Sequence, residues 1–170
     1  YVVSIVFIQQ AFSSATKEVG FIVVGLGAGL FAGTLIYGRL GTKYKIDGFR
    51  TIFACVMAGG IVLSIFVLTV LKTPNIALAL FLVFILGLVV SPIMVISNTL
   101  IQQLTDNTMR GKVFSSLEIV VHFAFLISML ASAPLADRIG PVKILLFVGI
   151  LLMLIGLTGT LRYYVKNRRA

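Results

Sequence analysis

Residues 76–104 read IALALFLVFILGLVVSPIMVISNTLIQQL, and this stretch decides the fold. No Asp, Glu, Lys or Arg occurs from Thr73 to Thr105, a longer run than the ~18 apolar residues that indicate a membrane span. Because hydrocarbon offers no water, each backbone N–H and C=O must bond internally, and a helix achieves this within one segment. The stretch therefore predicts a membrane-spanning helix.

Similar charge-free runs lie on both sides of it. The ~10-residue alternating segments of a membrane barrel are absent. We therefore predict an all-α, polytopic transmembrane bundle in a single domain, whose first span is the remnant of a helix cut in the middle. The predicted spans are 1–12 (partial), 19–40, 51–71, 76–104, 112–134 and 143–164.

The composition excludes several other classes of protein. The chain is 59% hydrophobic and 11% charged, whereas soluble domains have roughly 45–50% apolar and 25% charged residues. One His, one Cys (Cys55) and five acidic residues form no metal-ligand cluster, and neither G-x-S-x-G nor a phosphate-binding G-x-x-x-x-G-K-[ST] loop occurs. We expect no enzyme, no cofactor and no metal site.

The net charge of +9 is concentrated in short connections, which indicates membrane orientation rather than a nucleic-acid partner. Ten of the 14 basic residues fall in connections on one side. The positive-inside rule places the 41–50 and 105–111 loops and the C-terminus in the cytoplasm, which predicts a multi-pass protein of the cell membrane, most simply a bacterial cytoplasmic membrane. The ten are Arg39, Lys43, Lys45, Arg50, Arg110, Lys112, Arg162, Lys166, Arg168 and Arg169.

Small residues and one proline mark two spans. Gly25, Gly29 and Gly33 recur every four residues, and such a stripe lets another helix approach closely. We favour a tight helix contact over a substrate-lining surface for this stripe. Pro92 removes a backbone hydrogen bond in mid-span, so the 76–104 helix should bend there, either as a static kink or as a gating hinge.

Polar residues inside the predicted spans are the candidate functional residues. Ser91, Asn98 and Gln102 share one helix face, which should point into the bundle or a cavity because polar groups are costly in hydrocarbon. They could line a pathway or form hydrogen bonds between helices, and the sequence favours neither.

Glu118 and His122 lie four residues apart, and hence on one face of the predicted 112–134 helix. They lie roughly 9 and 15 Å from its cytoplasmic end at 1.5 Å per residue, which brings His122 near the midplane. A carboxylate beside an imidazole can take up and release protons, as a proton-coupled transporter requires. The alternative is that Glu118 reaches the interface or pairs with Lys112 or Arg110, while His122 makes a packing hydrogen bond.

Three connections between the predicted spans carry motifs: Arg110-Gly111-Lys112-Val113-Phe114-Ser115, Pro134-Leu135-Ala136-Asp137-Arg138-Ile139-Gly140-Pro141 and Gly38-Arg39-Leu40. These motifs resemble connections of the major facilitator superfamily, in particular of its drug, macrolide and siderophore exporters. The first resembles the junction between the tenth and eleventh helices of that family. The second is similar to the external link before the last helix, and the third begins like the cytoplasmic loop between helices eight and nine.

The resemblance covers the whole chain and implies the C-terminal six-helix half of a major facilitator fold. It implies a secondary active transporter that exports small amphipathic compounds by alternating access, with membrane lipids, a small-molecule substrate and the N-terminal half of the same transporter as partners. Two alternatives remain at this stage. One is a lysophospholipid flippase, and the other is an integral-membrane enzyme or assembly subunit that uses Glu118 and His122.

Overall fold

The computed structural model describes residues 2–12, 17–43 and 47–167, and in these ranges the chain forms α-helices and no strand. The all-α fold class expected from the sequence is confirmed. Lys45, Arg168 and Arg169, which entered the orientation argument, lie outside the described residues. The helices are α1 (Val2–Phe12), α2 (Lys17–Lys43), α3 (Gly48–Lys72), α4 (Ile76–Leu104), α5 (Arg110–Ile139) and α6 (Pro141–Asn167).

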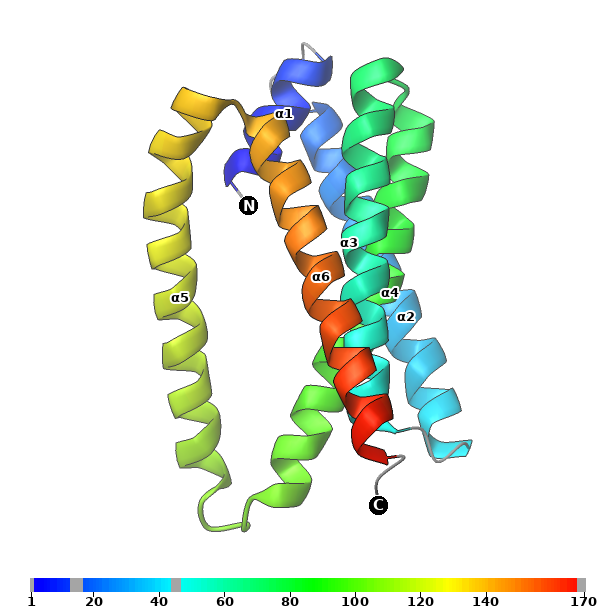
Figure 1. The fold of residues 1–170 in the computed structure, drawn as a ribbon, viewed down its shortest axis with the longest axis vertical. Helices are drawn as coiled ribbons and strands as arrows, with labels where there is room; N and C mark the ends of the chain where they lie inside the picture. Colours follow the sequence, from blue (N-terminus) through cyan, green and yellow to red (C-terminus); the bar gives the residue numbers. More distant parts are fainter. Residues whose placement is uncertain (1, 13–16, 44–46, 168–170) are drawn as a thin grey trace.

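The helices α2 to α6 are each long and apolar enough to cross a membrane. Helix α1 has 11 residues, so it is about 16 Å long and is shorter than the roughly 30 Å hydrocarbon layer. Helix α3 begins at Gly48 and α5 begins at Arg110, at the same end of the bundle as the last residues of α2, α4 and α6 (Figure 1). We call this end, where helices begin or finish at Lys43, Gly48, Leu104, Arg110 and Asn167, the basic end.

Helices α2, α3, α4 and α6 form a packed bundle, and α5 stands apart from it. Helix α2 packs against α4, and α3 packs against both α4 and α6. Helix α5 runs beside the bundle and approaches it mainly at its two ends, while α1 lies at the end opposite the basic end (Figure 1). Almost every described side chain of α5 is exposed, in contrast to α3 and α4.

The α2–α4 contact is close because glycines remove side chains from it. A Cβ added at Gly29 would overlap the Phe84 carbonyl oxygen, and one at Gly33 would overlap the Ser91 hydroxyl. A Cβ on Gly25 would lie 2.9 Å from a Leu80 methyl carbon. The glycine stripe therefore faces α4. In lipid such close backbone approach lets dispersion forces and polar contacts hold two helices together.

The α3–α6 contact is built in the same way. A Cβ at Gly60 would lie 2.6 Å from the Gly149 carbonyl oxygen, and one at Gly156 would lie 2.5 Å from the Met57 nitrogen. Gly149 and Gly156 are seven residues apart on α6 and were not singled out from the sequence. Two turns of helix separate them, so both face α3.

The buried apolar cluster lies at the end opposite the basic end and takes residues from α1, α2, α3, α4 and α6. Phe7 of α1 and Phe66 of α3 make an edge-to-face contact with their ring centroids 6.1 Å apart, and Val67 and Val70 beside them are fully buried. Aromatic pairs of this geometry add about 0.5–1.5 kcal/mol beyond their area burial. The short helix α1 is thereby fixed to the bundle.

The link between the last two helices is shorter than the sequence indicated. We expected a span at 112–134 and then an external link containing Asp137, Arg138 and Gly140, but α5 continues through Pro134 to Ile139. Gly140 alone separates α5 from α6, with a φ of 90° that favours glycine, and its N–H bonds the Ala136 carbonyl at 3.0 Å. Pro141 then starts α6, where a missing N–H costs nothing.

Candidate functional site

Helix α5 brings Glu118 and His122 together. The His122 Nδ1 lies 3.2 Å from a carboxylate oxygen of Glu118 and 2.8 Å from its backbone carbonyl oxygen. The side chains of His122 and Glu118 are 72% and 68% exposed. The pair follows from helical spacing alone, since residues four apart stack on one face. A protonated imidazole here forms an ion pair with the carboxylate.

The surroundings of this pair are apolar. Ile119, Val120 and Phe123 on the same stretch of α5 are 69%, 64% and 63% exposed. Among the described residues, no ion pair joins Glu118 to Arg110 or Lys112, which the sequence left open as partners. A charged pair on an apolar helix requires water or a polar protein surface beside it, because a charge in hydrocarbon is costly.

Ser91 is placed by the proline that follows it. Pro92 has no N–H, so the Leu88 carbonyl one turn earlier lacks its usual helical donor. The Ser91 hydroxyl donates to this carbonyl at 3.2 Å, and the side chain is buried against α2 where Gly33 leaves room. Pro92, Ser91 and Gly33 are therefore structurally linked: the proline frees a carbonyl, the serine bonds it, and the glycine leaves room for the serine. The sequence did not indicate this, because it does not show which helix faces Ser91.

Asn98 and Gln102 lie beyond Pro92 on the same face of α4, and both are exposed. No hydrogen bond in the described part of the chain joins their side chains to Glu118 or His122. The structure thus separates the polar face of α4 into a buried residue at Ser91 and an open patch toward the basic end.

Arg110 connects α4 to α5. Its Nη2 donates to the Gln102 carbonyl at 2.9 Å and its Nε to the Thr105 carbonyl at 3.3 Å. The last four carbonyls of a helix have no intrahelical donor, and a cation is favourable at this negative end of the helix dipole. Arg110 therefore caps α4. The sequence did contain a signal for this cap. The last turn of α4 has no basic residue, and an arginine follows a few residues later.

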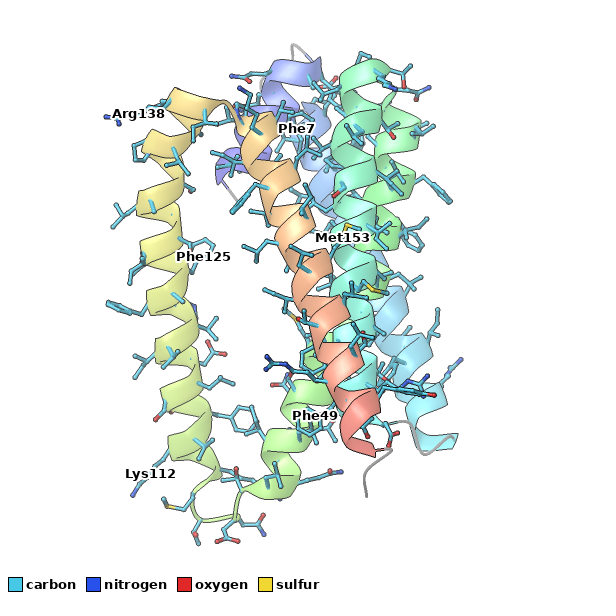
Figure 2. All side chains as sticks on the ribbon, viewed as in Figure 1. Phe7, Phe49, Lys112, Phe125, Arg138 and Met153 are labelled. Atoms are coloured by element: carbon cyan, nitrogen blue, oxygen red, sulfur yellow. The ribbon has the colours of Figure 1, made fainter. Side chains whose placement is uncertain are left out.

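The remaining motif residues at the basic end are exposed. Gly38, Arg39, Gly111 and Lys112 all lie on helix surfaces, and a Cβ at Gly38 or Gly111 would meet open space. Figure 2 shows Lys112 and Arg138 near opposite ends of α5, and Phe125 pointing from α5 toward α6. At positions 38 and 111, no neighbouring atom of the described residues would clash with a larger side chain and the backbone φ is not positive, so the structure does not require glycine there.

Two of the cavities between the described helices have both polar and apolar lining. One of about 250 Å³ lies where α1, α3, α5 and α6 meet, and its polar lining comes from Ser4, Ser128 and Ser132. The second, of about 530 Å³, lies between the beginning of α3 and the end of α6. Within the described ranges, no three His, Cys, Asp or Glu side chains gather in a way that could hold a metal ion.

Comparison with known families gives one match. The family model of the Major Facilitator Superfamily matches residues 1–169. No match was found among curated proteins or among solved structures.

Proposed function

The chain belongs to the major facilitator superfamily, a family of membrane transporters, and from this premise we propose proton-coupled export of small amphipathic compounds by alternating access. With five helices able to cross a membrane, it is a multi-pass membrane protein. The observation that carries the proposal is the Glu118–His122 pair, exposed on an otherwise apolar helix.

Protonation changes the cost of enclosing this pair. With a neutral imidazole beside an ionised carboxylate, the pair carries one negative charge, and a proton on His122 brings its net charge to zero. A neutral, paired group is much cheaper to enclose than a single buried charge. Proton uptake therefore favours the conformation in which this face of α5 is covered, and proton release favours the open one.

We expect a partner to cover the exposed surface of α5. A second six-helix half of the same transporter, packed against α5, would cover the apolar side chains and face Glu118 and His122 across a pathway. Asn98 and Gln102 on α4 would line the same pathway near its cytoplasmic end, because the basic end faces the cytoplasm in this proposal. Movement of one half against the other would then open the pathway to each side in turn.

The direction of transport and the class of cargo are supported by sequence motifs. The R-G-K junction at Arg110–Lys112 and the A-D-R-I-G-P sequence at 136–141 resemble those of drug and siderophore exporters. Cells that express the full transporter should therefore extrude an amphipathic dye, and a protonophore should stop them.

Conservative variants test the coupling. We expect Glu118→Gln and His122→Ala each to lower the initial rate of gradient-driven dye efflux by roughly tenfold or more, equivalent to about 1.4 kcal/mol. Passive equilibration of dye through the transporter should persist, because the helix contacts are unchanged. Asp106→Asn is the control, since it neutralises an exposed carboxylate outside the pair, in the short connection just before α5. Unchanged gradient-driven efflux in both variants of the pair would rule out this coupling role.

A further inference from the structure

The 530 Å³ cavity at the basic end has a polar part and an apolar part. It lies between the first turns of α3 and the last turns of α6, which run side by side here (Figure 1). Its lining comprises Asp47, Arg50, Ala54, Met57, Thr160, Leu161, Tyr163 and Tyr164. We propose that it holds one anionic phospholipid, with the phosphate at Arg50 and an acyl chain along the apolar lining.

The Asp47 carboxylate lies at the beginning of α3 but does not cap the helix. The Asp47 side chain makes no capping hydrogen bond, and the first turn contains no acidic residue. Arg50 instead places a cation in that turn, at the positive end of the helix dipole, which is unfavourable. No ion pair joins Arg50 to a carboxylate in the described residues. A phosphate group would pair with the Arg50 guanidinium and accept hydrogen bonds from the uncapped N–H groups of this turn.

The end of α6 supplies the aromatic groups expected at a membrane surface. Tyr163 is half-buried and Tyr164 is exposed, and phenolic side chains favour the headgroup region because one end is apolar and the other polar. The Thr160 hydroxyl already donates to the Leu157 carbonyl at 2.8 Å. The donors left for a phosphate are therefore the Arg50 guanidinium and the Tyr163 hydroxyl.

The apolar lining continues toward the middle of the bundle. Ala54 and Met57 follow Arg50 by one and about two helical turns, which is roughly 6 and 10 Å at 1.5 Å per residue. Leu161 lines the cavity from α6. A headgroup at the helix ends with an acyl chain extending inward matches this order of polar and apolar groups.

Asp47 distinguishes between lipid classes. Its carboxylate repels a phosphate, so its removal should strengthen the binding of an anionic lipid such as phosphatidylglycerol. A headgroup with an ammonium, such as that of phosphatidylethanolamine, would instead gain from Asp47. We choose the anionic lipid because Arg162, which is exposed on the same last turns of α6, adds positive charge at this end of the bundle.

Native mass spectrometry of the full-length transporter, titrated with phosphatidylglycerol, tests the proposal. We expect Arg50→Gln to weaken binding of the first lipid by about fivefold or more, and Asp47→Asn to tighten it about twofold. Lys72→Gln, which removes an exposed cation at the other end of α3, should have no effect. Phosphatidylcholine, which has no net charge, should bind the wild type and Lys72→Gln more weakly than phosphatidylglycerol does.

A second variant separates lipid binding from folding and from simple phosphate binding. Ala54→Leu fills the apolar lining without altering charge, so it should also weaken binding of the first phosphatidylglycerol. Excess inorganic phosphate should not displace the lipid, because the acyl chain contributes to its binding. Equal phosphatidylglycerol affinity in wild type, Arg50→Gln and Ala54→Leu, displacement by phosphate, or weaker lipid binding in Asp47→Asn would each overturn the proposal.

Discussion

At the scale of single residues, hydrogen bonds explain which polar side chains the membrane tolerates. Ser91 donates to the carbonyl that Pro92 leaves without a donor, and Arg110 caps the end of α4. The spacing of Ser91, Asn98 and Gln102 predicted a shared helix face. The partner of each residue could not be predicted, because helical periodicity does not identify the neighbouring helix or the carbonyl that lacks a donor.

The Ser91–Pro92 unit gives a prediction for stability. We expect Ser91→Ala to lower the free energy of unfolding by about 0.6–2 kcal/mol, because it leaves the part-buried Leu88 carbonyl without a donor. In a Pro92→Ala background, Ser91→Ala should lower the free energy of unfolding much less, since the new N–H at position 92 can bond the Leu88 carbonyl. Reversible unfolding in detergent measures both, with Ser97→Ala as the control. Equal costs in the two backgrounds would contradict this explanation.

At the scale of helices, uncharged runs predicted an all-α membrane fold, and the structure has that fold. The last turns of α5 were missed because Asp137 and Arg138 look like loop residues, whereas Gly140 alone provides the break. Which helices pack together was also beyond the sequence, since a helix that is apolar on all sides shows no amphipathic face. The glycines locate the two closest contacts, α2 with α4 and α3 with α6.

Two glycines of α2 provide a matched test of the α2–α4 contact. Gly29→Val should destabilise the protein by several kcal/mol or abolish folding, because a side chain there overlaps the backbone of α4 at Phe84. Gly27→Val should be tolerated, since a Cβ at Gly27 meets open space. Thermal unfolding of the two purified variants makes the comparison. Similar unfolding temperatures for both would show that the stripe does not hold the helices together.

At the scale of the whole molecule, five of the described helices are long and apolar enough to cross a membrane, and α5 stands exposed beside the other helices. The charge pattern predicts on which side each connection lies, and the family match gives the general function. The position of α5 relative to the bundle could not be predicted from the sequence, because that position depends on packing rather than on hydropathy.

Cysteine labelling of the two ends of α5 tests the membrane topology most directly. In a Cys55→Ala background of the full-length transporter, Lys112→Cys and Arg138→Cys each introduce one thiol at an exposed position. In intact cells a membrane-impermeant maleimide should label position 138, and it should label position 112 only after the membrane is permeabilised. Labelling of both positions from the same side of the intact membrane would contradict a membrane-spanning α5 and the transport pathway proposed along it.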